Sequence, residues 1–160
     1  MVVVIAILAT MLFPMITNMM ERMARANCTM NLKALFVGTE LYLQDNRIWP
    51  QIDTSLLDNT SSDEYARQWI KILAPYKISE NTWHCPTIEK TLTQGLKNKQ
   101  KQDKRIDYYP MPFDDKEITP HRWSTQPWFI ERGAVHGNGN LMIFTDGSVK
   151  NLGDMLYRKK

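Results

Sequence analysis

The chain has 160 residues, a length that supports one modest hydrophobic core rather than two. A hydrophobic fraction of 43% and a charged fraction of 23% exclude a polytopic membrane protein and a disordered chain. The net charge of +3 is too small to indicate nucleic-acid binding by itself. Every Lys, Arg, Asp and Glu lies after position 20, so an uncharged apolar segment precedes a polar globular part.

Residues 1–20 are predicted to form an apolar helix. A helix rises about 1.5 Å per residue, so roughly 20 residues match the hydrocarbon core of a bilayer. Pro14 lies within this segment, and membrane helices accommodate proline by kinking. A helix that is apolar on every face needs lipid or a large core, and the short chain favours a transmembrane helix over a buried core helix. On the positive-inside rule alone, Arg22 and Arg25 would keep the following part in the cytoplasm.

The helix is predicted to continue beyond the apolar segment, since no breaker intervenes. Apolar side chains then recur at helical spacing and predict one buried stripe: Cys28, Leu32, Leu35, Phe36, Thr39 and Leu43. We therefore expect one helix over residues 1–45, transmembrane over 1–20 and amphipathic over 21–45, followed by a globular domain over 46–160. Cys28 lies on the face that packs against the globular part.

Three further features are predicted in the globular part: a helix, an exposed loop and an aromatic cluster. Ser61 and Glu64 have the spacing of a capping box, and apolar residues at helical spacing follow until Pro75 ends the helix. Residues 97–105 are rich in basic side chains and are read as an exposed loop. Three aromatic residues lie close together before the predicted hairpin: Trp123, Trp128 and Phe129. They are interpreted as an aromatic cover over a sheet, with a subunit contact as the alternative.

Residues 141–152 are predicted to form a hairpin. Asp146-Gly147 is typical of a two-residue type I′ turn, which would pair Phe144 with Val149 and Leu141 with Leu152. His136, in the preceding glycine-rich loop, is expected to hydrogen-bond the Asp146 carboxylate or the turn backbone.

The sequence supplies no site for catalysis, a cofactor or a metal. The common nucleotide-binding and hydrolase motifs are absent. Two cysteines cannot provide a four-cysteine zinc site, and the three histidines are too scattered for a local metal motif. We therefore expect no enzymatic activity, no cofactor and no nucleic-acid partner.

Three short elements in chain order carry a resemblance. The first is the apolar run around Pro14 followed by C-x-x-N-L-K, formed by Cys28, Asn31, Leu32 and Lys33. The second is W-H-C-P, which ends in Cys85 and Pro86. The third is H-x9-D-G, formed by His136 and Asp146-Gly147. In these elements the chain resembles type IV pilin-like proteins and type II secretion pseudopilins, in particular the bacterial set with a prepilin-type N-terminal cleavage/methylation segment.

The resemblance implies an α+β, pilin-like fold: a long N-terminal helix packed on a small antiparallel sheet, with one additional short helix. It implies a structural subunit that is anchored in the bacterial inner membrane by a single pass, with a periplasmic globular domain. The partners would be other pilin-like subunits, the secretion or pilus assembly machinery and the lipid bilayer. The alternative is a membrane-anchored periplasmic binding domain that does not polymerise and uses its Trp-rich region.

Members of this set begin with a basic leader and a G-F-T-L-I-E segment, and Met1 corresponds to a position inside their apolar run. We expect either that this start lies upstream in the gene, where a prepilin peptidase would process it, or that the subunit is not processed. A basic leader on the cytoplasmic side would reconcile the topology with Arg22 and Arg25.

A periplasmic location would place Cys28 and Cys85 in an oxidising compartment, and we predict a disulfide between them. The closed loop would contribute roughly 4 kcal/mol in the chain-entropy model. Two buried free thiols are the alternative.

Overall fold

The computed structural model describes residues 2–53, 62–95, 104–116, 119–137 and 139–156, with side chains in the first helix from Met19 onward. That helix, α1, runs without interruption over Val2–Asn46. It ends where Arg47 adopts a left-handed φ of 62° and donates its backbone N–H to the Leu43 carbonyl. One long helix ending near residue 45 is therefore confirmed.

The expected membrane segment, residues 1–20, lies almost wholly where the backbone alone is described, and so does Pro14. In the part of the chain that the structure describes, no helix combines the length and apolar character needed to cross a membrane.

The predicted stripe of α1 is the face that packs. Five of its six side chains are buried, and Phe36 is half-buried against the core. Thr39 is accommodated in this apolar face because its hydroxyl donates to the Leu35 carbonyl one turn earlier. Cys28 is the first fully buried side chain along the described part of α1.

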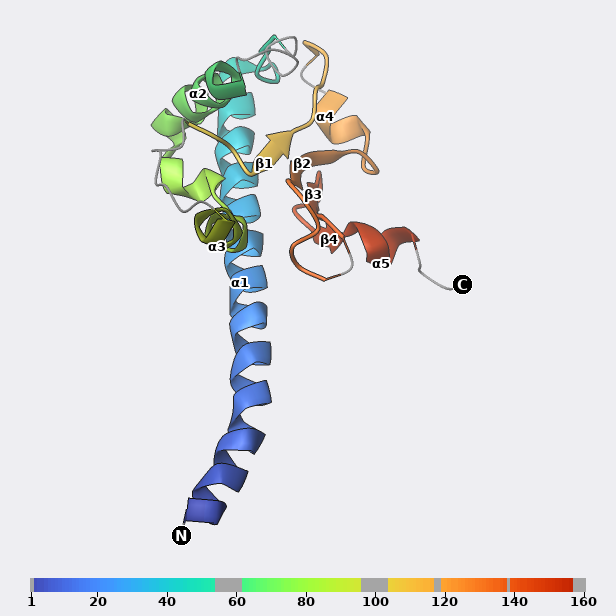
Figure 1. Ribbon diagram of the computed structural model, residues 1–160. Helices are drawn as coiled ribbons and strands as arrows, with labels where there is room; N and C mark the ends of the chain where they lie inside the picture. Colours follow the sequence, from blue (N-terminus) through green and yellow to red (C-terminus); the bar gives the residue numbers. More distant parts are fainter. Residues whose placement is uncertain (1, 54–61, 96–103, 117–118, 138, 157–160) are drawn as a thin grey trace.

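Four short helical elements follow α1 on one side of it (Figure 1): α2 (Ser62–Leu73), η2 (Ala74–Tyr76), η3 (Glu80–Trp83) and α3 (Pro86–Gly95). The predicted helix before Pro75 is confirmed as α2, although its expected cap Ser61 lies outside the described residues. The expectation of one additional short helix was wrong. Pro86 stands at the first position of α3, where the missing backbone N–H has no helical partner to lose. A proline at this position is typical of a helix start, and the sequence prediction did not include this helix.

The remaining chain forms a four-stranded antiparallel meander in the order β1-β2-β3-β4. Its strands are β1 (Tyr108–Pro110), β2 (Pro127–Glu131), β3 (Leu141–Phe144) and β4 (Val149–Asn151). Two short helices accompany the sheet. The helix α4 (Thr119–Arg122) precedes β2, and α5 (Leu152–Leu156) follows β4. Together these elements confirm the α+β class.

The β3–β4 hairpin exists, but its predicted register was wrong by one residue. Ile143 pairs with Val149, and Leu141 pairs with Asn151. The Gly147 N–H donates to the Phe144 carbonyl at 2.8 Å, and within this turn the positive φ (70°) falls on Gly147. This is a type I turn followed by a glycine in the left-handed region, which gives a three-residue loop. Asp146 favours that turn because its Oδ1 accepts the Ser148 N–H.

The core is rich in aromatic side chains. Trp49, just after α1, packs against Phe113 and Trp128 with ring centroids 4.7 and 5.2 Å apart. Trp128 and Phe129 are fully buried, which confirms core packing for these two, whereas Trp123 is 51% exposed. Thus the Trp-rich region is mostly interior.

The basic loop was predicted over residues 97–105, and the structure describes only its last two residues, Lys104 and Arg105. Arg105 in that part is not a solvated side chain: it is partly buried and bonds the carboxylates of Asp107 and Glu89. Its pKa is raised by these two carboxylates against the opposing effect of burial.

Candidate functional site

Four side chains that carry metal-binding or redox-active atoms meet in the interior, and we refer to them as the four-residue cluster: Cys28, Cys85, Glu131 and His136. Each comes from a different place in the fold. Cys28 lies on α1, Cys85 immediately before α3, Glu131 at the end of β2, and His136 in the loop between β2 and β3. All four are buried, with residue exposures of 0, 0, 1 and 8% in that order.

The polar atoms of the cluster converge on one point, since their ligand atoms lie within 4.8 Å of one another. The two sulfurs are 2.8 Å apart. Nε2 of His136 lies 3.4 Å from the Cys85 sulfur and 3.2 Å from Oε1 of Glu131. The imidazole therefore stands between a thiol and a carboxylate.

Glu131 is the least expected member, because its carboxylate is buried. Oε2 accepts the backbone N–H of Leu141 at 3.4 Å. Oε1 accepts no hydrogen bond from the described residues, although the His136 ring lies beside it. Burial, followed by contact with Cys85, raises the pKa of Glu131 to about 8.

The two cysteines act as one titrating unit. The hydrogen bond between them lowers the pKa of Cys85 and raises that of Cys28, because one thiol stabilises the thiolate of the other. The structure thus brings together the pair expected to form a disulfide. The sulfurs are not joined in it, and the disulfide stays a prediction.

The W-H-C-P segment is held against α1 and the sheet by polar contacts. Asn31 donates its side-chain amide to the His84 carbonyl at 3.0 Å. The Cys85 N–H donates to the buried Asp107 carboxylate at 2.9 Å, and Arg105 bonds the same carboxylate. These bonds fix the position of the Cys85 sulfur.

The other residues of the resemblance have separate environments. Leu32 is buried in the core, whereas Lys33 and Pro86 are exposed. Asp146 and Gly147 form the hairpin turn, and Asp146 is exposed. The hydrogen bonds from Ser148 lower the pKa of Asp146.

The expected contact between His136 and Asp146 was wrong. The side chain of His136 turns inward to Cys85 and Glu131, while Asp146 bonds Ser148 at the turn. Asn151 fixes the loop that carries His136, because its side-chain amide donates to the His136 and Gly139 carbonyls. The two ends of the H-x9-D-G motif therefore have different structural roles.

Sequence reasoning missed Glu131 and hence the cluster. It judged metal binding from local spacing, whereas these ligands come from four distant segments. A signal was available: strand alternation puts Glu131 on the same side of β2 as Phe129, and both are buried.

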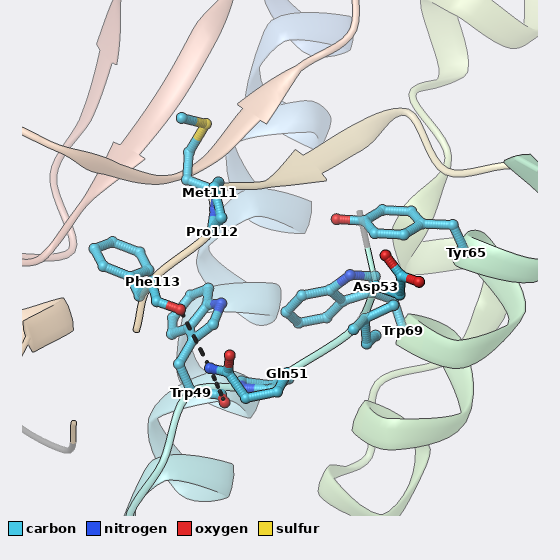
Figure 2. Close-up of a pocket in the computed structure, with 10 residues that line it drawn as sticks. Trp49, Gln51, Asp53, Tyr65, Trp69, Met111, Pro112 and Phe113 are labelled. Carbon is cyan, nitrogen blue, oxygen red and sulfur yellow. Dashed lines mark hydrogen bonds between the residues drawn. The ribbon is translucent and has the colours of Figure 1, made fainter. Parts of the chain in front are cut away.

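A second hollow lies near the C-terminal end of α1. It has a volume of about 290 Å³, and its lining includes four aromatic side chains: Trp49, Tyr65, Trp69 and Phe113. Figure 2 shows Trp69 from α2 beside Trp49 and Tyr65 beside Trp69, with Gln51 donating to the carbonyls of Trp49 and Phe113. The pocket is small and does not contact the four-residue cluster.

Comparison of the chain with protein-family models, with curated proteins and with solved structures gives no match. The functional proposal below therefore rests on the residues and the geometry described above.

Proposed function

We propose that this chain is a pseudopilin-like structural subunit of a type II secretion or type IV pilus-related system. It is anchored in the bacterial inner membrane by the N-terminal part of α1 and presents its globular part to the periplasm. The observation that carries the proposal is the asymmetry of α1. Its C-terminal part packs on the globular elements, while its N-terminal part extends away from them (Figure 1).

The extended part offers apolar surface to a neighbour. Met19, Met20 and Met23 are each more than half exposed, with fractions of 62, 56 and 56%. The apolar sequence of residues 2–16 continues in the same direction along the helix. Flexible methionines pack against surfaces of varied shape, and an apolar helix exchanges lipid for helix neighbours at little cost.

The proposed partners are other pilin-like subunits and the machinery that assembles them. A prepilin peptidase acts only on a leader, and the gene sequence upstream of Met1 decides whether this chain is a substrate. An in-frame basic leader followed by G-F-T-L-I-E supports processing and assembly.

Site-specific photo-cross-linking tests the proposal in cells that carry the upstream gene region and the cognate assembly system. A cross-linking residue at Met23 should capture a second copy or another pilin-like subunit, and deletion of the assembly ATPase should abolish the capture. The same residue at Glu64, exposed on α2 and away from the extended helix, is the control. Protease added to spheroplasts should degrade the globular part, as expected for a periplasmic location.

The second candidate is a membrane-anchored periplasmic binding domain that does not polymerise. The observation in its favour is the aromatic pocket of Figure 2. Capture of lipid alone at Met23, with and without the ATPase, would contradict assembly and favour this second function.

A further inference from the structure

The four-residue cluster has the composition and the spacing of a metal centre. Thiolate and imidazole ligands suit zinc, whereas calcium and magnesium prefer oxygen ligands. In a tetrahedral zinc site, neighbouring ligand atoms are separated by about 3.3 to 3.8 Å. The distances from Nε2 of His136 to the Cys85 sulfur and to Oε1 of Glu131, 3.4 and 3.2 Å, already lie near this range. The two sulfurs, 2.8 Å apart, must separate by about 1 Å to reach this range.

The buried carboxylate supplies an independent reason. A disulfide would use the two sulfurs alone, whereas a metal ion would also use the Glu131 carboxylate and the His136 ring, which lie beside them. Oε1 of Glu131 is buried, accepts no hydrogen bond in the described structure and faces the other three ligand atoms. A cation at the centre would coordinate this oxygen and offset the cost of burying it without a hydrogen bond.

A surface groove borders the cluster on one side. This groove, lined by Arg25, Pro86 and Val135, reaches His136, the least buried of the four residues. The cluster is therefore nearest to solvent at His136, where α1, α3 and the β2–β3 loop meet.

We propose that the four-residue cluster binds one Zn²⁺ ion with tetrahedral coordination. Binding forms two Zn–S bonds, one Zn–O bond and one Zn–N bond, and it releases the thiol protons to solvent together with any proton on the carboxyl group. No electrons are transferred. Disulfide formation would instead remove two electrons from the same sulfurs, so the two states exclude each other. With four protein ligands the site is closed and structural, joining α1 to the sheet.

The test uses the full chain in mild detergent, reduced, supplied with Zn²⁺ and dialysed before metal analysis. We expect one zinc per chain and two thiols that resist alkylation until a chelator removes the metal. Glu131→Gln and His136→Gln keep both cysteines, and each should weaken zinc affinity by at least about 100-fold. The matched controls Glu64→Gln and His121→Gln, at exposed positions, should retain the affinity of the parent chain.

Cobalt substitution of the unaltered chain gives a readout that does not depend on the folding of a variant. Co²⁺ should produce the visible bands of tetrahedral coordination and a near-ultraviolet thiolate charge-transfer band. The proposal is overturned if the reduced chain binds no zinc, or if the cluster variants bind it as tightly as the parent. It is equally overturned if native membrane material carries a Cys28–Cys85 disulfide and no zinc. These results do not bear on the cross-linking at Met23, so the two proposals can fail separately.

Discussion

Gly38→Ala should destabilise the protein although alanine is the better helix former. An alanine in a helix interior is favoured over glycine by about 1 kcal/mol. A Cβ at Gly38, however, would lie 2.5 Å from Cγ1 and 2.9 Å from Cδ1 of Ile78, well inside van der Waals contact. Ile78 is only 7% exposed and must shift, and overpacking of this kind costs about 1–3 kcal/mol. The net loss should be about 1 kcal/mol.

Urea unfolding of the full chain in mild detergent, followed by tryptophan fluorescence, measures this loss in the free energy of unfolding. In an Ile78→Ala background the clash is gone, and Gly38→Ala should become neutral or stabilising. Val37→Ala, at the adjacent exposed position of α1, controls for helix propensity and should not destabilise. Stabilisation by Gly38→Ala in the presence of Ile78 would falsify the packing of α1 described here.

Three further predictions concern the turn, the motif and the cluster. Gly147→Ala should cost about 1 kcal/mol in urea unfolding, because φ is +70° there. Asn31→Ala should cost about 1–2 kcal/mol, because it leaves the His84 carbonyl without its donor, whereas Asn46→Ala at an exposed site should change stability by less than about 0.5 kcal/mol. The raised pKa of Glu131 means that the metal-free, reduced native state holds a proton between about pH 4.5 and 8 that the unfolded chain has released. The contribution of Glu131 to stability should therefore fall as pH rises through this range, while the lowered pKa of Cys85 acts in the opposite direction above about pH 6. Replacing Glu131 by Gln removes the first contribution, so stability should rise more, or fall less, with pH in Glu131→Gln than in the parent; equal slopes for the two proteins would refute the assignment.

The two longest helices that the structure describes, α1 and α2, could be predicted from the sequence because helical periodicity is a local signal. The stripe from Cys28 to Leu43 identified the buried face of α1, and Pro75 marked the end of α2. The proximity of Cys28 and Cys85 was also anticipated, because the resemblance implies an oxidising compartment in which the two cysteines of the chain would pair.

The hairpin register could not be settled in the same way. Asp-Gly is compatible with a two-residue type I′ turn and with a type I turn that ends in a left-handed glycine. The second forms here because the Asp146 carboxylate accepts the Ser148 N–H. One residue of difference in the loop is enough to change every cross-strand pair.

The four-residue cluster could not be predicted from local sequence patterns, because it is formed by tertiary structure alone. Its members are separated by up to about a hundred positions along the chain, and no local spacing rule connects them. Their convergence requires the meander to place the end of β2 over α1 and the side chain of Asn151 to hold the loop that carries His136.

The position of the cluster along α1 links the two proposals physically. Cys28 is the first fully buried side chain in the described part of α1, so the cluster lies where the helix leaves the globular part. Without a cross-link, helix ends open at little free-energy cost, and the last packed turn would be the first to separate from the sheet. A metal ion held by the cluster would tie that turn to three other segments, and a disulfide would tie it to the segment of Cys85. Force applied to the extended helix by neighbouring subunits would then reach the globular core through the cluster rather than peel α1 away from it.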